Sequence, residues 1–417
     1  MKQILLIIAA LLCLAALPAS AFTSKSMLFA DSYMLRAEGC DANYWNPALL
    51  NPENGNIWLP VLNSGMFLGN NSINIDLYNY IMERDYLDDE AKQHILDAID
   101  DRLAFDMGGN FGIFGITMGN VALTSSVHLA AKAAFDEQYL QLLLYGNGDG
   151  TQVYEFEHED NYFDSVSYMD LTLGMGDIRL PLPEAVPDIK VGFAASLLGG
   201  IGNARTEELH GYFSSDLDGL NVRQDVLLRT GAAGGGFKGL IGLYSEPIPN
   251  LFAGVTLDNI FGFLKWGLVR EEFQASFEVD SLYAIDISDD DFYTWDYEQR
   301  KTDPFTTKLP MELRAAALFH TNQVSLSVDY VKGFGSSPDA SRQGRFSLGA
   351  ELTPLPILPI HLGYCLGNDI YPWRTSYGIG LDLKFLEFGL GIQSIESILP
   401  GTSSKGISFA SYFNIRL

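Results

Sequence analysis

Apolar and polar residues alternate along the C-terminal third of the chain. In the last eleven residues the apolar side chains, among them Phe409 and Leu417, share one phase, and the polar ones, among them Asn414 and Arg416, share the other. Six more segments alternate in the same way, at 309–319, 324–330, 346–352, 360–364, 377–385 and 388–392, with Gly, Pro, Asn or Ser at most joints. A period of two is typical of strands with one apolar face, so these segments predict an antiparallel meander.

Strand patterns continue upstream, and one helix interrupts them. Residues 189–197 alternate clearly, 231–242 are rich in glycine, and 121–135, 165–175 and 252–263 are weaker candidates. With a first strand near 57–68, this gives about fourteen strands. In the loop at about 76–101, Leu87, Ala91, Ile95 and Ile99 recur at four-residue spacing with Asp88 in front as the N-cap, which predicts an amphipathic helix.

The N-terminus predicts export. Residues 1–21 comprise a charged start at Lys2, an apolar run and a final Ala-Ser-Ala, which is the pattern of a cleaved signal peptide. A lipoprotein signal at Cys13 is the alternative, but Leu12 before it is too large. Export followed by alternating strands predicts an all-β, antiparallel transmembrane β-barrel in the outer membrane of a Gram-negative-type bacterium, with lipid on the apolar face. A soluble secreted β-protein would also alternate and stays open.

Composition and motifs exclude several classes of partner and of chemistry. The net charge of −26 excludes a nucleic-acid partner. Cys40 and Cys365 have no metal-ligand spacing, and the sequence leaves open whether they pair. Neither an HExxH nor a GxSxG motif occurs, so we expect no enzyme, cofactor or metal. The acidic stretch 286–296 matches no calcium loop and predicts a solvated loop.

Short motifs resemble a known group of proteins. The N-terminal region contains Arg36-Ala37-Glu38-Gly39 and then Trp45-Asn46-Pro47-Ala48, and further motifs are Val191-Gly192-Phe193, Leu257 to Gly262, Leu309-Pro310, Asp329-Tyr330 and Gly406 to Phe409. Together they resemble the FadL-like outer-membrane barrels, which include the long-chain fatty-acid transporter and the PorV-type secretion proteins. The similarity is strongest to the DUF5723 branch.

The resemblance implies a fourteen-strand barrel over residues 57–417, with residues 22–56 inside it as a plug. It also implies a channel for uptake of hydrophobic or amphipathic small molecules, or alternatively a PorV-like scaffold that does not transport. The expected partners are outer-membrane lipid, a hydrophobic ligand, and surface or secreted proteins. Two departures limit the comparison: the chain ends in Leu417 rather than Phe, and it lacks an aligned set of basic residues to bind a carboxylate.

Two groups of candidate site residues follow. In Trp45-Asn46-Pro47-Ala48, Asn46 is suited to cap a turn, so the motif is either a fold determinant of the plug or part of a ligand site. Charged or polar residues on the predicted lumenal phase form either a polar path or structural ion pairs. They are Glu312, Arg314, Asp329, Arg345, Glu351, His361, Asp382, Lys384, Asn414 and Arg416.

Overall fold

The computed structural model describes residues 23–417 except 61, 100, 148–151, 184–186, 217–218, 283–292, 335–343 and 368–369. The predicted signal peptide and most of the acidic stretch therefore lie outside the described residues. The described helices are η1 (Lys25–Phe29), α2 (Ala42–Trp45), η2 (Pro47–Leu49), η3 (Pro52–Asn54), α3 (Ile75–Met82), α4 (Asp89–Ile99) and α5 (Glu137–Tyr145). None of these helices is long and apolar enough to cross a membrane.

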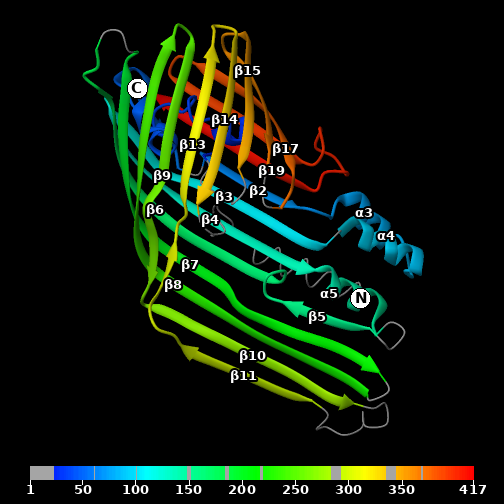
Figure 1. The fold of residues 1–417 in the computed structure, drawn as a ribbon. Helices are drawn as coiled ribbons and strands as arrows, with labels where there is room; N and C mark the ends of the chain where they lie inside the picture. The colour runs from blue at the N-terminus through cyan, green and yellow to red at the C-terminus, as the bar shows by residue number, and fades with distance from the viewer. Residues whose placement is uncertain are drawn as a thin grey trace.

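The described strands join into one antiparallel sheet that closes on itself (Figure 1). They are β1 (Asn56–Trp58), β2 (Ser64–Asn70), β3 (Arg102–Met118), β4 (Val121–Asp136), β5 (Val153–Glu157), β6 (Tyr162–Arg179), β7 (Ile189–Asp216), β8 (Gly219–Ile248), β9 (Leu251–Trp266), β10 (Val269–Leu282), β11 (Thr294–Lys301), β12 (Phe305–Lys308), β13 (Met311–His320), β14 (Val324–Phe334), β15 (Arg345–Leu355), β16 (Leu358–Leu366), β17 (Trp373–Leu383), β18 (Leu386–Ile395) and β19 (Gly406–Arg416). The result is a closed 14-strand antiparallel barrel, which confirms the predicted fold class.

Several of these segments are pieces of one barrel strand. β1 and β2 both pair with β3 and β19, and β5 and β6 both pair with β7. β9 and β10 follow one another along β8, and β11, β12 and β13 follow one another along β10 and β9. The meander predicted for the C-terminal third is present as β13 to β19, each paired with its neighbour in the sequence.

The first and last strands close the barrel. β19 pairs with β2 from Gly406↔Gly69 to Ser411↔Ser64 and with β1 from Trp58↔Asn414 to Asn56↔Arg416, which confirms the predicted closure. The first strand predicted near 57–68 is present as one barrel strand, but it is interrupted, because the chain leaves the ladder between β1 and β2. Pro60 has no N–H to donate there, and the Asn63 side chain bonds the backbone of Phe413 in place of a ladder pair.

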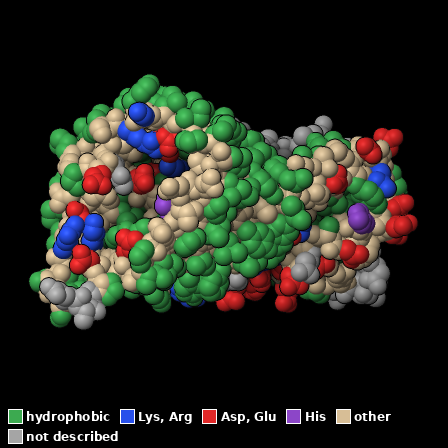
Figure 2. All heavy atoms as spheres, turned by 90° about the horizontal axis from the view of Figure 1, so that it is seen from above, with side chains coloured by type: hydrophobic (Ala, Val, Ile, Leu, Met, Phe, Trp, Pro, Cys, Tyr) green, Lys and Arg blue, Asp and Glu red, His purple; other side chains and the backbone are tan. Residues whose placement is uncertain are grey.

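The terminal strand has the predicted orientation. Phe409 is 58% exposed on the outer face, while Tyr412 and Asn414 are buried on the inner one. Similar exposed apolar residues occur on many strands, and Figure 2 shows hydrophobic side chains in a band across the middle of the molecule. Charged side chains gather toward the two ends of this band, which is the surface expected of a barrel that spans a bilayer.

The two ends of the barrel differ. At one, which we call the short-turn end, strands join through two or three residues, at 119–120, 249–250, 321–323, 356–357 and 384–385. The opposite, long-loop end carries α3, α4 and α5. β7 and β8 are 28 and 30 residues long, whereas crossing a bilayer takes about 9–11. These strands, with β10 and β11, therefore extend beyond the apolar band at the long-loop end (Figure 1).

The predicted helix is present at the long-loop end. The Asp88 carboxylate accepts a hydrogen bond of 2.9 Å from Ala91 N, which caps α4. Apolar residues of α4 pack with Leu77 of α3, Leu103 of β3 and Leu140 of α5. α3 lies within the helical loop predicted at about 76–101, whereas α5 is absent from the sequence prediction. Each has an N-cap side chain, Asn74 and Asp136.

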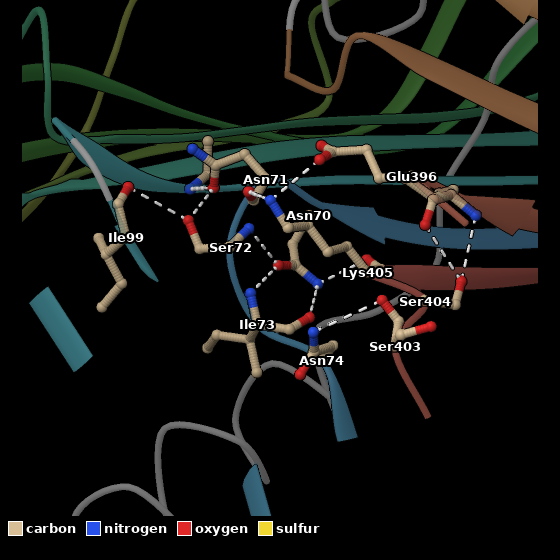
Figure 3. A network of polar contacts seen from close by, with 12 residues as sticks. Asn70, Asn71, Ser72, Ile73, Asn74, Ile99, Glu396, Ser403, Ser404 and Lys405 are labelled. Carbon is tan, nitrogen blue, oxygen red and sulfur yellow. Dashed lines mark hydrogen bonds and ion pairs between the residues drawn. The ribbon is translucent and has the colours of Figure 1, made fainter. Parts of the chain in front are cut away.

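A polar network fastens the seam at this end (Figure 3). Asn70, at the end of β2, donates to the carbonyl of Lys405 at 2.7 Å and accepts from Ser72 N at 2.8 Å. The Lys405 ammonium lies 3.0 Å from Glu396 and donates to Asn71 O at 2.6 Å. The network joins the first barrel strand, the loop before the last strand and, through Ser72 and Ile99, the end of α4.

Candidate functional site

The N-terminal segment, residues 23–50, crosses the inside of the barrel. Its first helix, η1, contacts β15 to β19, whereas η2 contacts β6, β7 and β8 on the other side. Most of its residues are buried, and the segment lies within the ring of strands near the C-terminus (Figure 1). We call residues 23–50 the lumenal segment.

Ion pairs and hydrogen bonds hold the η1 half of the lumenal segment. Asp31 pairs with Arg374 on β17, and Lys25 pairs with Glu387 on β18. Gln393 of β18 also donates to the carbonyl of Met27 at 2.7 Å. Since Arg374 and Glu387 are both buried, these charges are compensated by the lumenal segment itself.

Asp329 on β14 anchors the next turn. Its carboxylate accepts from Ser32 Oγ at 2.7 Å and from Met34 N at 3.0 Å. Arg36 lies over the Phe29 ring and donates to the side chains of Ser325 and Ser327. The predicted lumenal residue Asp329 therefore binds the lumenal segment directly.

A histidine–aspartate pair on the barrel wall binds the other half of the lumenal segment, which contains Tyr44. Tyr44 donates to Asp170 on β6 at 2.8 Å, and the second oxygen of Asp170 lies 2.8 Å from His128 Nε2. His128 Nδ1 lies 3.0 Å from the Asn110 amide, so both ring nitrogens are engaged. Ser126 lies two residues away, but His128 has no nitrogen left to activate it, and the group is not a nucleophilic triad.

The predicted motif Trp45-Asn46-Pro47-Ala48 forms a tight turn against the wall. Asn46 accepts from Ala48 N and donates to Leu243 O, each at 3.1 Å. Trp45 donates to Thr23 at 3.1 Å and packs edge-on against Tyr33. Of the two interpretations of this motif, a fold determinant or part of a ligand site, these contacts fit the fold determinant.

Glycines make room for that turn. A Cβ built on Gly192 of β7 lies 2.2 Å from Ala48 N and Pro47 C, and one on Gly176 of β6 lies 1.8 Å from Pro47 O. A Cβ on Gly242 of β8 lies 2.0 Å from Asn46 Oδ1. Three neighbouring strands thus carry glycine where the turn touches the wall, which gives the Val191-Gly192-Phe193 motif a structural reason.

The structure brings most of the predicted lumenal charges into pairs. Arg314 lies 2.7 Å from Glu312 and 3.4 Å from Asp258, and its guanidinium covers the Trp45 ring. Asp382 pairs with Arg416.

His361 is buried, with Nδ1 3.3 Å from Glu351. Asn414 donates to Glu387 at 3.3 Å, and Arg345 is the first residue of β15, on its inner phase. The prediction that Lys384 faces the lumen is wrong. The alternation continues into the turn between β17 and β18, where this side chain is exposed.

Sequence reasoning missed several of the anchoring residues. Asp170, Arg374 and Glu387 lie on inner phases of strands, but their partners are 126 to 362 residues away in the chain. Only their polar character within strand patterns could have marked them.

Cys40 and Cys365 are both buried and free, which answers the open question of their pairing. Among the described residues, no group of three or more His, Cys, Asp or Glu is placed to hold a metal ion.

A cavity of about 430 Å³ lies between the lumenal segment and the wall at the short-turn end. Residues of the segment line one side, and residues of β7 to β9 and β13 to β19 line the other. Figure 2 shows a hollow at one end of the molecule with acidic and basic side chains around it. We call this cavity the vestibule.

Asp41 gives the lumenal segment a predicted pH dependence. Burial raises the pKa of Asp41 to about 6, although Tyr33 donates to its carboxylate at 2.7 Å. The folded state therefore holds more protons than the released segment between about pH 4 and 6, so the segment becomes less stable as the pH rises through this window. The full difference is about 3 kcal/mol.

The buried thiol of Cys40 can report this change. Its labelling rate, normalised to that of the denatured protein at each pH, should rise from pH 4 to pH 7.5. Asp41→Asn should flatten the profile, because the amide can still accept from Tyr33 but does not titrate. An equal slope in the variant would assign the effect to other groups.

Comparisons with known proteins agree with this architecture. Residues 47–245 match the model of a family of unknown function, DUF5723. No curated protein sequence matches the chain. The crystal structure of the P. putida toluene transporter TodX is 10% identical, with 91% of this chain and 94% of that chain covered and a TM-score of 0.50.

A second solved structure, a Pseudomonas aeruginosa FadL homologue, is 7% identical, with 96% and 99% covered and a TM-score of 0.52. At these identities the likeness shows the fold. The resemblance drawn from the sequence motifs is confirmed: residues 47–245 match the DUF5723 family model, and the chain as a whole has a barrel fold like that of the FadL homologue.

Proposed function

We propose that the protein is an outer-membrane channel for hydrophobic or amphipathic small molecules, with the lumenal segment as its plug. The observation that carries this proposal is a separate, non-strand segment that crosses the lumen and is held against the wall by ion pairs, hydrogen bonds and apolar packing. The apolar outer band suits a bilayer, and the short-turn end would face the periplasm. TodX, which has a similar fold, is a toluene transporter, and this supports the proposal by analogy of fold.

A reversible lock tests whether solutes pass the plug. A Cβ built on Gly115 of β3 lies 2.8 Å from the Cys40 sulfur and 3.1 Å from its Cβ. Disulfides place the two Cβ atoms about 3.5–4.5 Å apart, so a small shift of the plug brings the pair to disulfide geometry. Gly115→Cys should therefore crosslink the plug to the wall under oxidation. In cells without their own hydrocarbon channel, uptake of labelled toluene should rise with the wild-type protein, fall with the oxidised variant and recover with reductant.

Two outcomes would change the proposal. Uptake no greater than in cells without the protein would contradict the channel. Uptake that the lock leaves unchanged would remove the axial path and favour a lateral one. The outer wall has an apolar groove of about 550 Å³ across β18, β19, β2 and β3, lined by Met66, Phe67 and Phe409, where a lateral path could open.

A PorV-like scaffold is the second candidate, and the long strands favour it. All residues of β11 are exposed, including Trp295 and Tyr297, and β11 is an edge strand in the part of the sheet that extends beyond the apolar band. Exposed edges and aromatic residues are typical of surfaces that bind other proteins. Surface proteins that co-purify with the wild type, and with the locked Gly115→Cys variant but not after deletion of 269–301, would support this function.

A further inference from the structure

The vestibule has an apolar half and a charged half. Tyr244 stacks on Phe252 with ring centroids 5.9 Å apart, and Leu318 and Leu35 complete this apolar wall. Charged side chains from the plug and from β15 to β19 line the other half. A volume of about 430 Å³ lies within the range of small-molecule sites, about 300–1,000 Å³. The shape and the two surfaces suit an amphipathic molecule.

The basic side chains of the vestibule already have partners. Arg36 donates to Ser327, to Ser325 twice and to the carbonyl of Gly349, so four of its five N–H groups are engaged. Lys25 pairs with Glu387, and Arg416 pairs with Asp382. Lys190 lies 2.6 Å from Asp177. A ligand carboxylate would therefore compete with an acceptor that each of these cations already has.

Among the hydrogen-bond acceptors that line the vestibule, Glu38 is available to a ligand. Glu38 is exposed to the vestibule, and among the described residues no hydrogen bond or ion pair reaches its carboxylate. Because the vestibule lies inside the barrel, desolvation raises the pKa of Glu38, and it outweighs the opposing effect of Lys25 and Arg416. Glu351 and His361 also line the vestibule.

His361 supplies the buried acceptor. It is 1% exposed, lines the vestibule, and neither of its ring nitrogens has a hydrogen-bond partner among the described residues. Nδ1 is the nitrogen that faces the Glu351 carboxylate, at 3.3 Å, which favours a proton on Nδ1 and a lone pair on Nε2. An ammonium group has three N–H donors, one for each of the acceptors Glu38, Glu351 and His361.

We propose that the vestibule binds cationic amphiphiles, with an ammonium head group between Glu38, Glu351 and His361 and an apolar tail against Tyr244, Phe252 and Leu318. This inference rests on the proposed channel function and names the substrate class that the channel would release. The charge of −26 on the chain also favours cations over anions in the surrounding field.

Three probes of equal chain length test the head group: hexylammonium, hexanoate and 1-hexanol. We would titrate each by calorimetry into the purified full chain in a neutral detergent. Hexylammonium should show saturable binding, 1-hexanol weaker binding, and hexanoate none. Glu38→Gln should weaken hexylammonium binding about tenfold or more, and Glu351→Gln should do so independently. Glu157→Gln, on β5 and remote from the vestibule, is the matched control and should bind as the wild type does.

Hexanoate binding equal to that of hexylammonium, or unchanged affinity in both Glu38→Gln and Glu351→Gln, would overturn the proposal. Heat-modifiable gel mobility verifies that each variant is a folded barrel. Failure here is distinguishable from failure of the channel. Toluene uptake without ammonium binding contradicts only the vestibule site, and ammonium binding without any uptake contradicts only the channel.

Discussion

Gly192→Ala should loosen the plug without unfolding the barrel. The added Cβ would lie 2.2 Å from backbone atoms of Pro47 and Ala48, so the turn cannot remain where it is. Overpacking of this kind costs about 1–3 kcal/mol. Burial raises the pKa of the Cys40 thiol, which reacts only after the plug moves. In a Cys365→Ser background, Cys40 labelling should therefore accelerate about 5- to 150-fold.

Gly199→Ala is the matched control on the same strand. A Cβ there has only one neighbour, Met169 O, at 4.0 Å. Its labelling rate should equal that of the wild type, and both variants should keep the gel mobility of a folded barrel. Equal rates for Gly192→Ala and Gly199→Ala would mean that the turn does not depend on the glycine at 192. Gly192→Ala should also increase conductance in planar bilayers if the plug closes the lumen.

The sequence alone predicted the strands that face lipid on one side and the lumen on the other. In β13 to β19 a shift of one residue would reverse every side chain, so alternation defines both the strands and their orientation. Tyr412 and Phe409 lie on the predicted faces for this reason. Alternation cannot locate a turn that continues the same phase, which is why Lys384 was misplaced.

The alternation of apolar and polar residues did not predict how far the long strands β7 and β8 extend. Among the residues of 203–215 and 219–232 in β7 and β8, most are half-buried and no regular apolar phase marks them. Charged side chains hold this part of the sheet together instead. Arg229 on β8 lies 3.0 Å from Glu207 of β7 and 3.0 Å from Glu272 of β10, and Arg300 of β11 lies 3.1 Å from Glu272. Such contacts depend on the final register and leave no periodic signal.

The candidate site shows the same division between local and long-range information. The cap of Asn46 on Ala48 is local, and the sequence predicted it from the residue types in the turn. The glycines that receive the turn come from β6, β7 and β8, and only the closed barrel brings them together. The polar anchors of the lumenal segment are equally long-range, because their partners lie on strands far away in the sequence.

Arg374→Met should release the η1 half of the plug more strongly than any surface change. It removes the buried partner of Asp31 and leaves that carboxylate without its counter-charge. Breaking a buried ion pair from one side costs about 3–5 kcal/mol. In the Cys365→Ser background, Cys40 labelling should therefore accelerate at least about a hundredfold. The double variant Asp31→Asn with Arg374→Met removes both charges, and replacing both members of a buried pair is often close to neutral. It should label at nearly the wild-type rate. If the double variant labels as fast as Arg374→Met, the packing of the arginine chain and not the ion pair holds this half of the plug.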